Sequence, residues 1–168
     1  EQVALFSQYF HVITVDLPGF GLNNALEAPE TIRGHAEFVL HQLDLQGVDQ
    51  FHLLGHSMGG MIVQEIAAMA PSRIDCLILY GTGPVGMLPN RFETIDESKR
   101  RVVSDGPRLT GRLIAATWFI KREQASQYHL CAELADKASF QAALAGLSAM
   151  ETWSGVSYLT QIKSPALV

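Results

Sequence analysis

The residues Gly55-His56-Ser57-Met58-Gly59 match the pattern G-x-S-x-G and carry the clearest chemical signal in the sequence. A serine hydroxyl is a weak nucleophile, so it reacts only where it is exposed, oriented and close to a base. A tight strand-to-helix turn meets the first two conditions by lifting the serine out of a sheet in a strained backbone conformation. We therefore predict that Ser57 is the nucleophile of an acyl-transfer reaction.

The neighbours of Ser57 have separate predicted roles. The backbone N–H of Met58 is expected at the N-terminus of a helix, where it can stabilise a developing oxyanion. Gly55 and Gly59 are expected to be glycines because neighbouring segments approach too closely for a Cβ. His56 is expected to pack beside the turn, since a side chain adjacent to Ser57 on a sharp turn points away from it.

The segments on either side of this motif have the patterns needed to hold it. Phe51-His52-Leu53-Leu54 is predicted to be a strand, and the Ala-, Ile- and Met-rich residues 59–70 are predicted to be a helix that Pro71 ends. Further elements are expected as a strand over 10–15, a helix over 31–45 and a strand over 74–80. The alternation of strands and helices indicates a right-handed parallel α/β sheet.

The pattern changes after residue 84, where strand-like runs disappear. Helical stretches are expected near residues 94–104, 107–120, 122–136 and 139–152. We predict a partial α/β core over 1–84, a helical cap over 85–161, and the start of the next core strand over 162–168. A helical insertion at the carboxyl edge of a sheet would act as a lid above a site.

These pieces resemble the α/β-hydrolase family. The resemblance is carried by residues 12–21, 55–60, 77–81 and 162–168, which come in the family's order. It implies a three-layer parallel sheet with a helical cap, and it looks closest to the capped branch of enol-lactonases, carbon–carbon bond hydrolases and small esterases. Serine at the nucleophile position disfavours the dehalogenase and epoxide-hydrolase branches, which use Asp there. The implied activity is cofactor-free hydrolysis of an ester, lactone or related acyl bond.

The resemblance also implies that other parts of the site lie outside the 168 residues. The family's early strands and its second oxyanion N–H would precede Glu1, and its catalytic acid and histidine would follow Val168. We therefore expect a chain truncated at both ends. Only Ser57 and Met58 can be assigned from the family pattern.

Several residues offer alternatives for the missing roles. The order Ser57…Asp105…His129 exists formally, although both partners fall in predicted cap helices, where such residues are usually surface groups. Asp16 follows the first predicted strand, and we expect it to cap the Pro-Gly loop after it. A base role for His56 is a further alternative to its expected packing role.

The cap region is expected to shape a pocket for a small-molecule acyl substrate. Aromatic and flexible apolar side chains there favour an apolar or ring-bearing substrate. They are Met87, Leu88, Phe92, Trp118, Phe119, Trp153 and Tyr158. Arg91, Arg108 or Arg112 is a candidate for binding a substrate carboxylate. Two rival functions are hydrolytic carbon–carbon cleavage of a dienoate and a non-catalytic ligand-binding module.

Composition excludes several other classes. The chain is 48% hydrophobic, 17% charged and has a net charge of −5, without a block of basic residues. This argues against nucleic-acid and anionic-membrane partners. We expect no cofactor and no metal site, because no His, Cys, Asp and Glu spacing suggests one. Cys76 and Cys131 are expected to be free thiols, which favours a cytoplasmic location, and the oligomeric state is left open.

Overall fold

The computed structural model describes residues 2–89 and 91–168. Its sheet has three parallel strands in the described part of the chain, in the order β1-β2-β3. They are β1 (Phe51–His56), β2 (Ile74–Tyr80) and β3 (Ala166–Leu167). In the register of β1 with β2, His56 lies beside Tyr80, so both strands end at the same edge. The predicted strands over 51–54, 74–80 and the end of the chain are confirmed.

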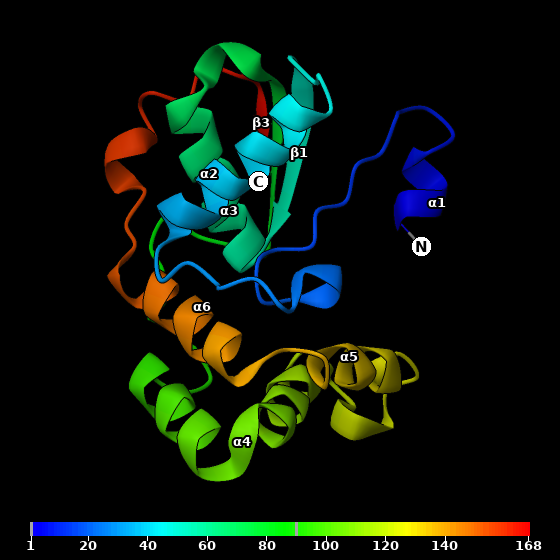
Figure 1. The fold of residues 1–168 in the computed structure, drawn as a ribbon, viewed down its shortest axis with the longest axis vertical. Coiled ribbons are helices and arrows are strands. Elements are labelled where there is room, and N and C mark those ends of the chain that lie inside the picture. Colours follow the sequence, from blue (N-terminus) through cyan, green and yellow to red (C-terminus); the bar gives the residue numbers. More distant parts are fainter. Residues whose placement is uncertain (1, 90) are drawn as a thin grey trace.

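Two helices cover one face of this sheet (Figure 1). They are α2 (Ile32–Leu45) and α3 (Met58–Met69). Helix α2 begins where the Thr31 hydroxyl accepts a hydrogen bond from the Gly34 N–H at 3.0 Å. The core between helices and sheet is apolar, with Ile66 of α3 and Leu77 of β2 fully buried. The helices predicted over 31–45 and 59–70 are confirmed.

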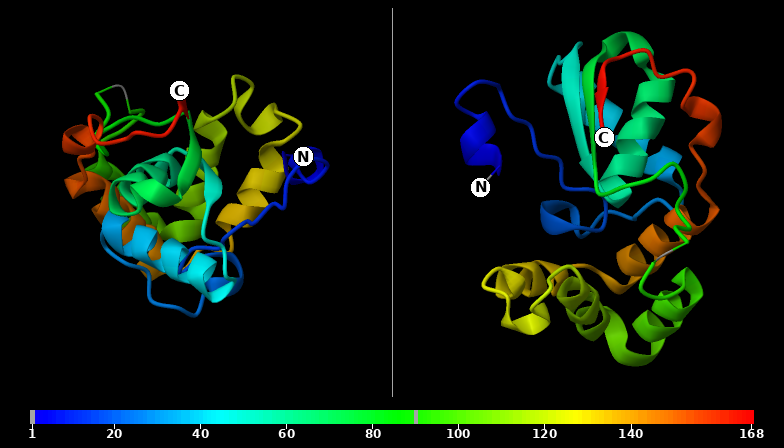
Figure 2. Two further views of the ribbon diagram at one scale, coloured as in Figure 1. Left: turned by 90° about the horizontal axis from the view of Figure 1, so that it is seen from above. Right: turned by 180° about the vertical axis from the view of Figure 1, so that it is seen from behind.

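The predicted strand over residues 10–15 is wrong for the described chain. Residues 11–17 have neither strand nor helix geometry, and none of residues 10–15 is buried. A strand exists only when a neighbour takes up its backbone hydrogen bonds, and no described segment pairs with this one. Its preceding helix, α1 (Gln2–Phe6), was not predicted and stands to the side of the sheet (Figures 1 and 2).

A helical layer lies beyond the sheet's carboxyl edge (Figure 2). It consists of α4 (Ile95–Thr117), α5 (Tyr128–Ala135) and α6 (Phe140–Thr152). Helix α4 is broken at Gly106, whose φ is 84° and ψ is 161°, so it is two helices in practice, as the separate predictions over 94–104 and 107–120 require. The helix predicted over 122–136 starts later than expected, at Tyr128.

Helix α6 links this layer to the core. Ala149 of α6 is fully buried in the same cluster as α3 and the sheet, while Leu147 packs with the start of α4. Short 3-10 helices in the described chain are η1 (Gly21–Asn23), η2 (Pro71–Arg73), η3 (Arg122–Gln124) and η4 (Val156–Tyr158). Because α6 shares a core with α3, it brings the helical layer close to the N-terminal end of α3.

His35 is a titratable group in the core. Its side chain is fully buried on α2, and neither ring nitrogen has a hydrogen-bond partner among the described residues. Desolvation by burial is the larger effect and lowers the pKa of His35 below its ordinary value of 6.5, while the nearby Pro29 backbone acts in the opposite direction. The histidine is therefore neutral in the folded state at pH 7.

We expect this histidine to make the fold sensitive to acid. Below pH 6.5 the unfolded chain binds a proton that folded His35 does not, so the free energy of unfolding decreases until the lower folded pKa is reached. His35→Leu should flatten this part of the stability curve, measured by urea unfolding from pH 7 to 5. An unaltered slope in His35→Leu would contradict the assignment.

Candidate functional site

Ser57 is the single residue between β1 and α3. Its φ is 52° and its ψ is −122°, and the only other described non-glycine residue with positive φ is Arg122. Such a conformation is strained for a residue with a Cβ. The Ser57 residue is exposed, and its side chain makes no capping hydrogen bond to α3. The predicted sharp turn is present, and the chemical role of Ser57 stays a prediction.

The end of β2 holds this turn from the side. The Ser57 N–H donates to the Tyr80 carbonyl at 3.2 Å. The Ser57 carbonyl accepts from the Thr82 hydroxyl at 2.8 Å, and from the Gly60 N–H at 2.9 Å and the Met61 N–H at 3.3 Å. Both polar groups of the Ser57 backbone are therefore satisfied, which stabilises the strained conformation.

Met58 is the first residue of α3. The first N–H groups of a helix have no acceptor within the helix, and the Met58 N–H donates to no described backbone carbonyl. This N–H is therefore available to donate a hydrogen bond to an oxyanion. The Met58 side chain reaches α6, because a Cβ on Gly146 would lie 3.6 Å from the Met58 sulfur and 4.0 Å from Phe20 Cζ. Helix α6 thus borders the turn that carries Ser57.

The two glycines of the motif differ in the space available for a Cβ. A Cβ on Gly55 would overlap the Gly59 carbonyl oxygen and lie 2.6 Å from Val63 Cγ2, so the strand and helix approach as closely as predicted. A Cβ on Gly59 would meet no described atom within 4 Å, so the steric prediction is wrong for this residue. The close approach at Gly59 involves its carbonyl oxygen and not its Cα. Gly60, the residue after the motif, is also crowded, since its Cβ would lie 2.6 Å from the Thr82 hydroxyl.

His56 and Asp16 have packing and capping contacts. The His56 ring lies against the Tyr80 ring, with centroids 5.2 Å apart, on the neighbouring strand. Asp16 accepts a hydrogen bond from the Leu22 N–H at 2.9 Å, and its carbonyl accepts one from Asn23 Nδ2 at 2.6 Å. Asp16 therefore closes the Pro-Gly loop as predicted.

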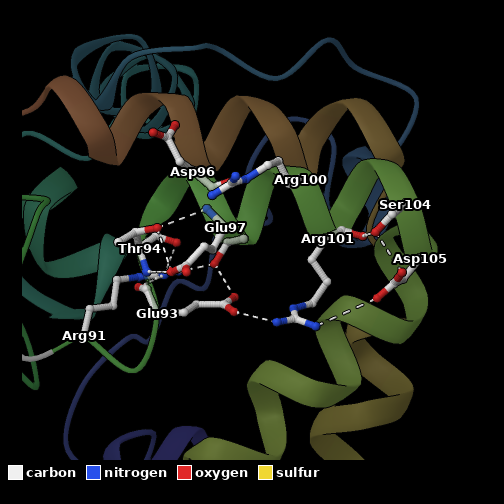
Figure 3. Close-up of polar contacts among 10 residues, drawn as sticks. Arg91, Glu93, Thr94, Asp96, Glu97, Arg100, Arg101, Ser104 and Asp105 are labelled. Carbon is white, nitrogen blue, oxygen red and sulfur yellow. Dashed lines mark hydrogen bonds and ion pairs between the residues drawn. The ribbon is translucent and has the colours of Figure 1, made fainter.

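Asp105 and His129 are engaged elsewhere. The Asp105 carboxylate accepts from the Ser104 hydroxyl at 2.8 Å and faces Arg101 at 3.9 Å at the kink in α4 (Figure 3). His129 is exposed on α5. The structure shows no contact between either residue and Ser57, so it lends no support to the internal triad.

The candidate carboxylate-binding arginines of the helical layer have internal partners. Arg91 donates to the Ser98 hydroxyl at 2.9 Å and to the Glu93 carbonyl at 2.6 Å, in a network at the start of α4 (Figure 3). Arg112 forms a two-fold hydrogen bond with Asp136 at 2.9 and 2.7 Å, which lowers the pKa of the Asp136 carboxyl.

Arg108 also faces Asp136, at 3.3 Å. The guanidinium groups of Arg91 and Arg112 thus stabilise the helical layer itself, and Arg108 neutralises the same carboxylate as Arg112. A role for them in substrate binding is not supported by these contacts.

Two aromatic residues proposed for the pocket contact Glu65 instead. Glu65 is 2% exposed on α3, and its carboxylate accepts from Trp153 Nε1 at 2.9 Å and Tyr158 Oη at 3.4 Å. Glu65 is eight residues after Ser57, about 12 Å along the helix axis. Trp153 and Tyr158 therefore hold the segment after α6 against α3.

We expect the Trp153 contact to contribute to stability. Trp153→Phe keeps an aromatic ring but removes the N–H, leaving a buried carboxylate with one donor fewer, and should cost about 2 kcal/mol of unfolding free energy. Tyr158→Phe is the matched control and should cost less, because its hydrogen bond is long at 3.4 Å. Chemical denaturation of both variants measures this. A larger loss in the tyrosine variant would contradict the ranking.

Sequence reasoning did not identify Thr82 or Gln64 as contacts of this turn. Gln64 is buried on α3, and its Nε2 donates to the Gly60 carbonyl at 3.0 Å and the Gly83 carbonyl at 3.1 Å. A polar residue within the apolar run 61–67 was the available signal, because buried polar groups need partners. Thr82 had no comparable signal.

Two further findings concern metals and membranes. Within residues 2–89 and 91–168, no three His, Cys, Asp or Glu side chains gather in a way that would hold a metal ion. Every helix that the structure describes is too short or too polar to serve as a membrane span.

Comparison with known proteins gives related matches. A family model described as the alpha/beta hydrolase fold matches residues 2–122. A pimeloyl-(acyl-carrier protein) methyl ester esterase from Pseudoalteromonas atlantica is 38% identical over 90 residues, which are 53% of this chain and 33% of that enzyme. A 2-hydroxy-6-oxo-6-phenylhexa-2,4-dienoate hydrolase from Burkholderia cepacia is 38% identical over 79 residues, 46% of this chain and 27% of that one.

A solved structure matches along almost the whole chain. The enol-lactonase from Burkholderia xenovorans superposes with a TM-score of 0.86 at 22% identity, covering 99% of this chain and 64% of that one. At this identity the likeness concerns the fold alone. The region matched in the curated relatives spans about a third of their length or less.

Proposed function

Because the chain belongs to the α/β-hydrolase fold family, we propose that the protein is a cofactor-free serine hydrolase with Ser57 as its nucleophile. The observation that carries the proposal is the exposed Ser57 at positive φ between β1 and α3. The substrate class is an ester, a lactone or a related acyl compound. An esterase among the relatives and an enol-lactonase among the structural neighbours support this class.

The proposed reaction has two steps, acylation of Ser57 and hydrolysis of the acyl-enzyme. Ser57 Oγ forms a bond to the substrate carbonyl carbon, its proton passes to a histidine base, and the carbonyl electron pair moves to the oxygen. The Met58 N–H donates to this oxyanion, which collapses and expels the alcohol with that proton. In the second step, water attacks the acyl carbon and gives a proton to the same histidine. This proton passes to Ser57 Oγ as the acid is released. Among the described residues no histidine or carboxylate side chain hydrogen-bonds to Ser57, so the base and its carboxylate are not assigned to particular residues.

Covalent labelling tests this proposal directly. A fluorophosphonate probe phosphonylates an activated serine, so incubation with the complete protein should modify the peptide that contains Ser57 and stop hydrolysis of p-nitrophenyl butyrate. Mass spectrometry of the digest locates the adduct. Labelling at another serine, or ester hydrolysis that persists after complete labelling of Ser57, would refute the assignment.

Hydrolytic carbon–carbon cleavage is the second candidate within the family. It is favoured by the 38% identity to a dienoate hydrolase. Turnover of a 2-hydroxy-6-oxo-dienoate that exceeds turnover of simple esters would select it. The non-catalytic binding module is the third, and it is favoured because the described chain shows no base in contact with Ser57. Absence of both labelling and turnover in the complete protein would select it.

A further inference from the structure

The peptide group that joins Ser57 to Met58 has two ends with different tasks. Its carbonyl oxygen belongs to Ser57 and its N–H belongs to Met58, and the group is planar with the two pointing in opposite directions. Any contact that sets the direction of the carbonyl therefore also sets the direction of the N–H. In the proposed function, this N–H is an oxyanion donor.

Three donors bind the carbonyl end. The Gly60 and Met61 N–H groups belong to the first turn of α3 itself, at 2.9 and 3.3 Å. The third donor is the Thr82 hydroxyl, at 2.8 Å, which comes from a different segment 25 residues along the chain. It is the shortest of the three contacts.

Thr82 is held in place from both sides. It lies two residues after Tyr80, the last residue of β2, whose carbonyl accepts the Ser57 N–H. It precedes Gly83, whose carbonyl accepts from the buried Gln64 side chain of α3 at 3.1 Å. The missing side chain of Gly60 leaves the space that the Thr82 hydroxyl and methyl occupy.

We propose that Thr82 is a positioning residue for the oxyanion donor. Its hydroxyl fixes the plane of the Ser57–Met58 peptide group, which aims the Met58 N–H at the site of the developing charge. Donation to the carbonyl also polarises the peptide, which makes the N–H at its other end a stronger donor. Thr82 does so without touching the substrate. This inference rests on the proposed function.

Two substitutions isolate the hydroxyl. Thr82→Ala removes the hydroxyl and the methyl, whereas Thr82→Ser removes only the methyl. In the complete protein, Thr82→Ala should lower kcat for p-nitrophenyl butyrate by about tenfold, less than the loss of an oxyanion donor itself. KM should change by less than about twofold, because the contact matters most in the transition state. Thr82→Ser should restore kcat.

A transition-state mimic gives a readout that a general loss of structure would not reproduce. An alkyl trifluoromethyl ketone accepts Ser57 Oγ at its carbonyl carbon and forms a tetrahedral oxyanion, while the base holds the serine proton. Its inhibition constant should rise about tenfold in Thr82→Ala. The corresponding trifluoromethyl alcohol cannot form the oxyanion, and its affinity should not change.

The outcomes separate this inference from the function on which it rests. Equal losses in Thr82→Ala and Thr82→Ser, equal weakening of the ketone and the alcohol, or full kcat in Thr82→Ala would overturn the role of Thr82. Ser57→Ala is measured in parallel. If Ser57→Ala is inactive while Thr82→Ala keeps full activity, only the positioning role fails. If Ser57→Ala stays active, the proposed function fails with it.

Discussion

Ser57→Ala should lower ester hydrolysis by the complete protein on the order of 10⁶-fold, the scale seen when a serine hydrolase loses its nucleophile. The substitution removes one oxygen atom and keeps the Cβ, so the backbone strain at φ 52° is the same in both proteins. The side chain is exposed and makes no capping hydrogen bond to α3. Its loss should therefore leave the unfolding temperature nearly unchanged.

The kinetic measurement needs a stability measurement beside it. Initial rates with p-nitrophenyl butyrate give the loss of kcat/KM, and thermal unfolding shows that the variant is folded. Ser104→Ala is a suitable control, because Ser104 is also exposed but lies on α4 with its hydroxyl on Asp105. It should keep wild-type activity. Retained activity in a folded Ser57→Ala protein would remove Ser57 from the mechanism.

Gly55→Ala should destabilise the protein by about 3 kcal/mol, the upper range for an added group in a crowded site. The new Cβ would overlap the Gly59 carbonyl oxygen and lie 2.6 Å from Val63 Cγ2, so β1 and the first turn of α3 would have to separate. That movement would also displace Ser57, which lies between them. We therefore expect slower labelling of Ser57 by the fluorophosphonate probe in addition to lower stability.

Gly59→Ala is the matched comparison within the same motif. Its Cβ would meet no described atom within 4 Å, and alanine is favoured over glycine inside a helix by about 1 kcal/mol. Urea unfolding should therefore show a stability equal to or above that of the wild type. Equal destabilisation of both variants would mean that the close approach extends to the Gly59 Cα, contrary to the structure.

The elements around Ser57 were predictable because their signals are local. The strand predicted over 74–80 coincides with β2, and the helix predicted over 31–45 matches α2 to within one residue. In each segment the apolar residues recur at the spacing of a single type of element, strand or helix, and a glycine or proline lies near its end. The run over 10–15 has equally good composition but no paired neighbour in the described chain, and composition alone does not supply one.

The partners of polar side chains were much less predictable. Arg91 and Arg112 were candidates for substrate binding, but Arg91 donates hydrogen bonds to Ser98 and Arg112 donates them to Asp136. Trp153 was a candidate for lining the pocket, but its indole N–H donates a hydrogen bond to the buried Glu65 carboxylate. In each case the residue type was compatible with several partners. Only the packing of segments brings one of them within hydrogen-bond distance.

The position of a serine at a strand-to-helix junction is predictable from residues 51–70, because the glycines and the apolar runs that make this turn are its immediate neighbours. The contacts that hold the turn come from distant segments. Thr82 reaches the Ser57 carbonyl from 25 residues away, and Gln64 ties the Thr82 segment to α3. Periodicity and turn chemistry are properties of a short stretch of chain, whereas a contact between two stretches depends on how both pack against a common core.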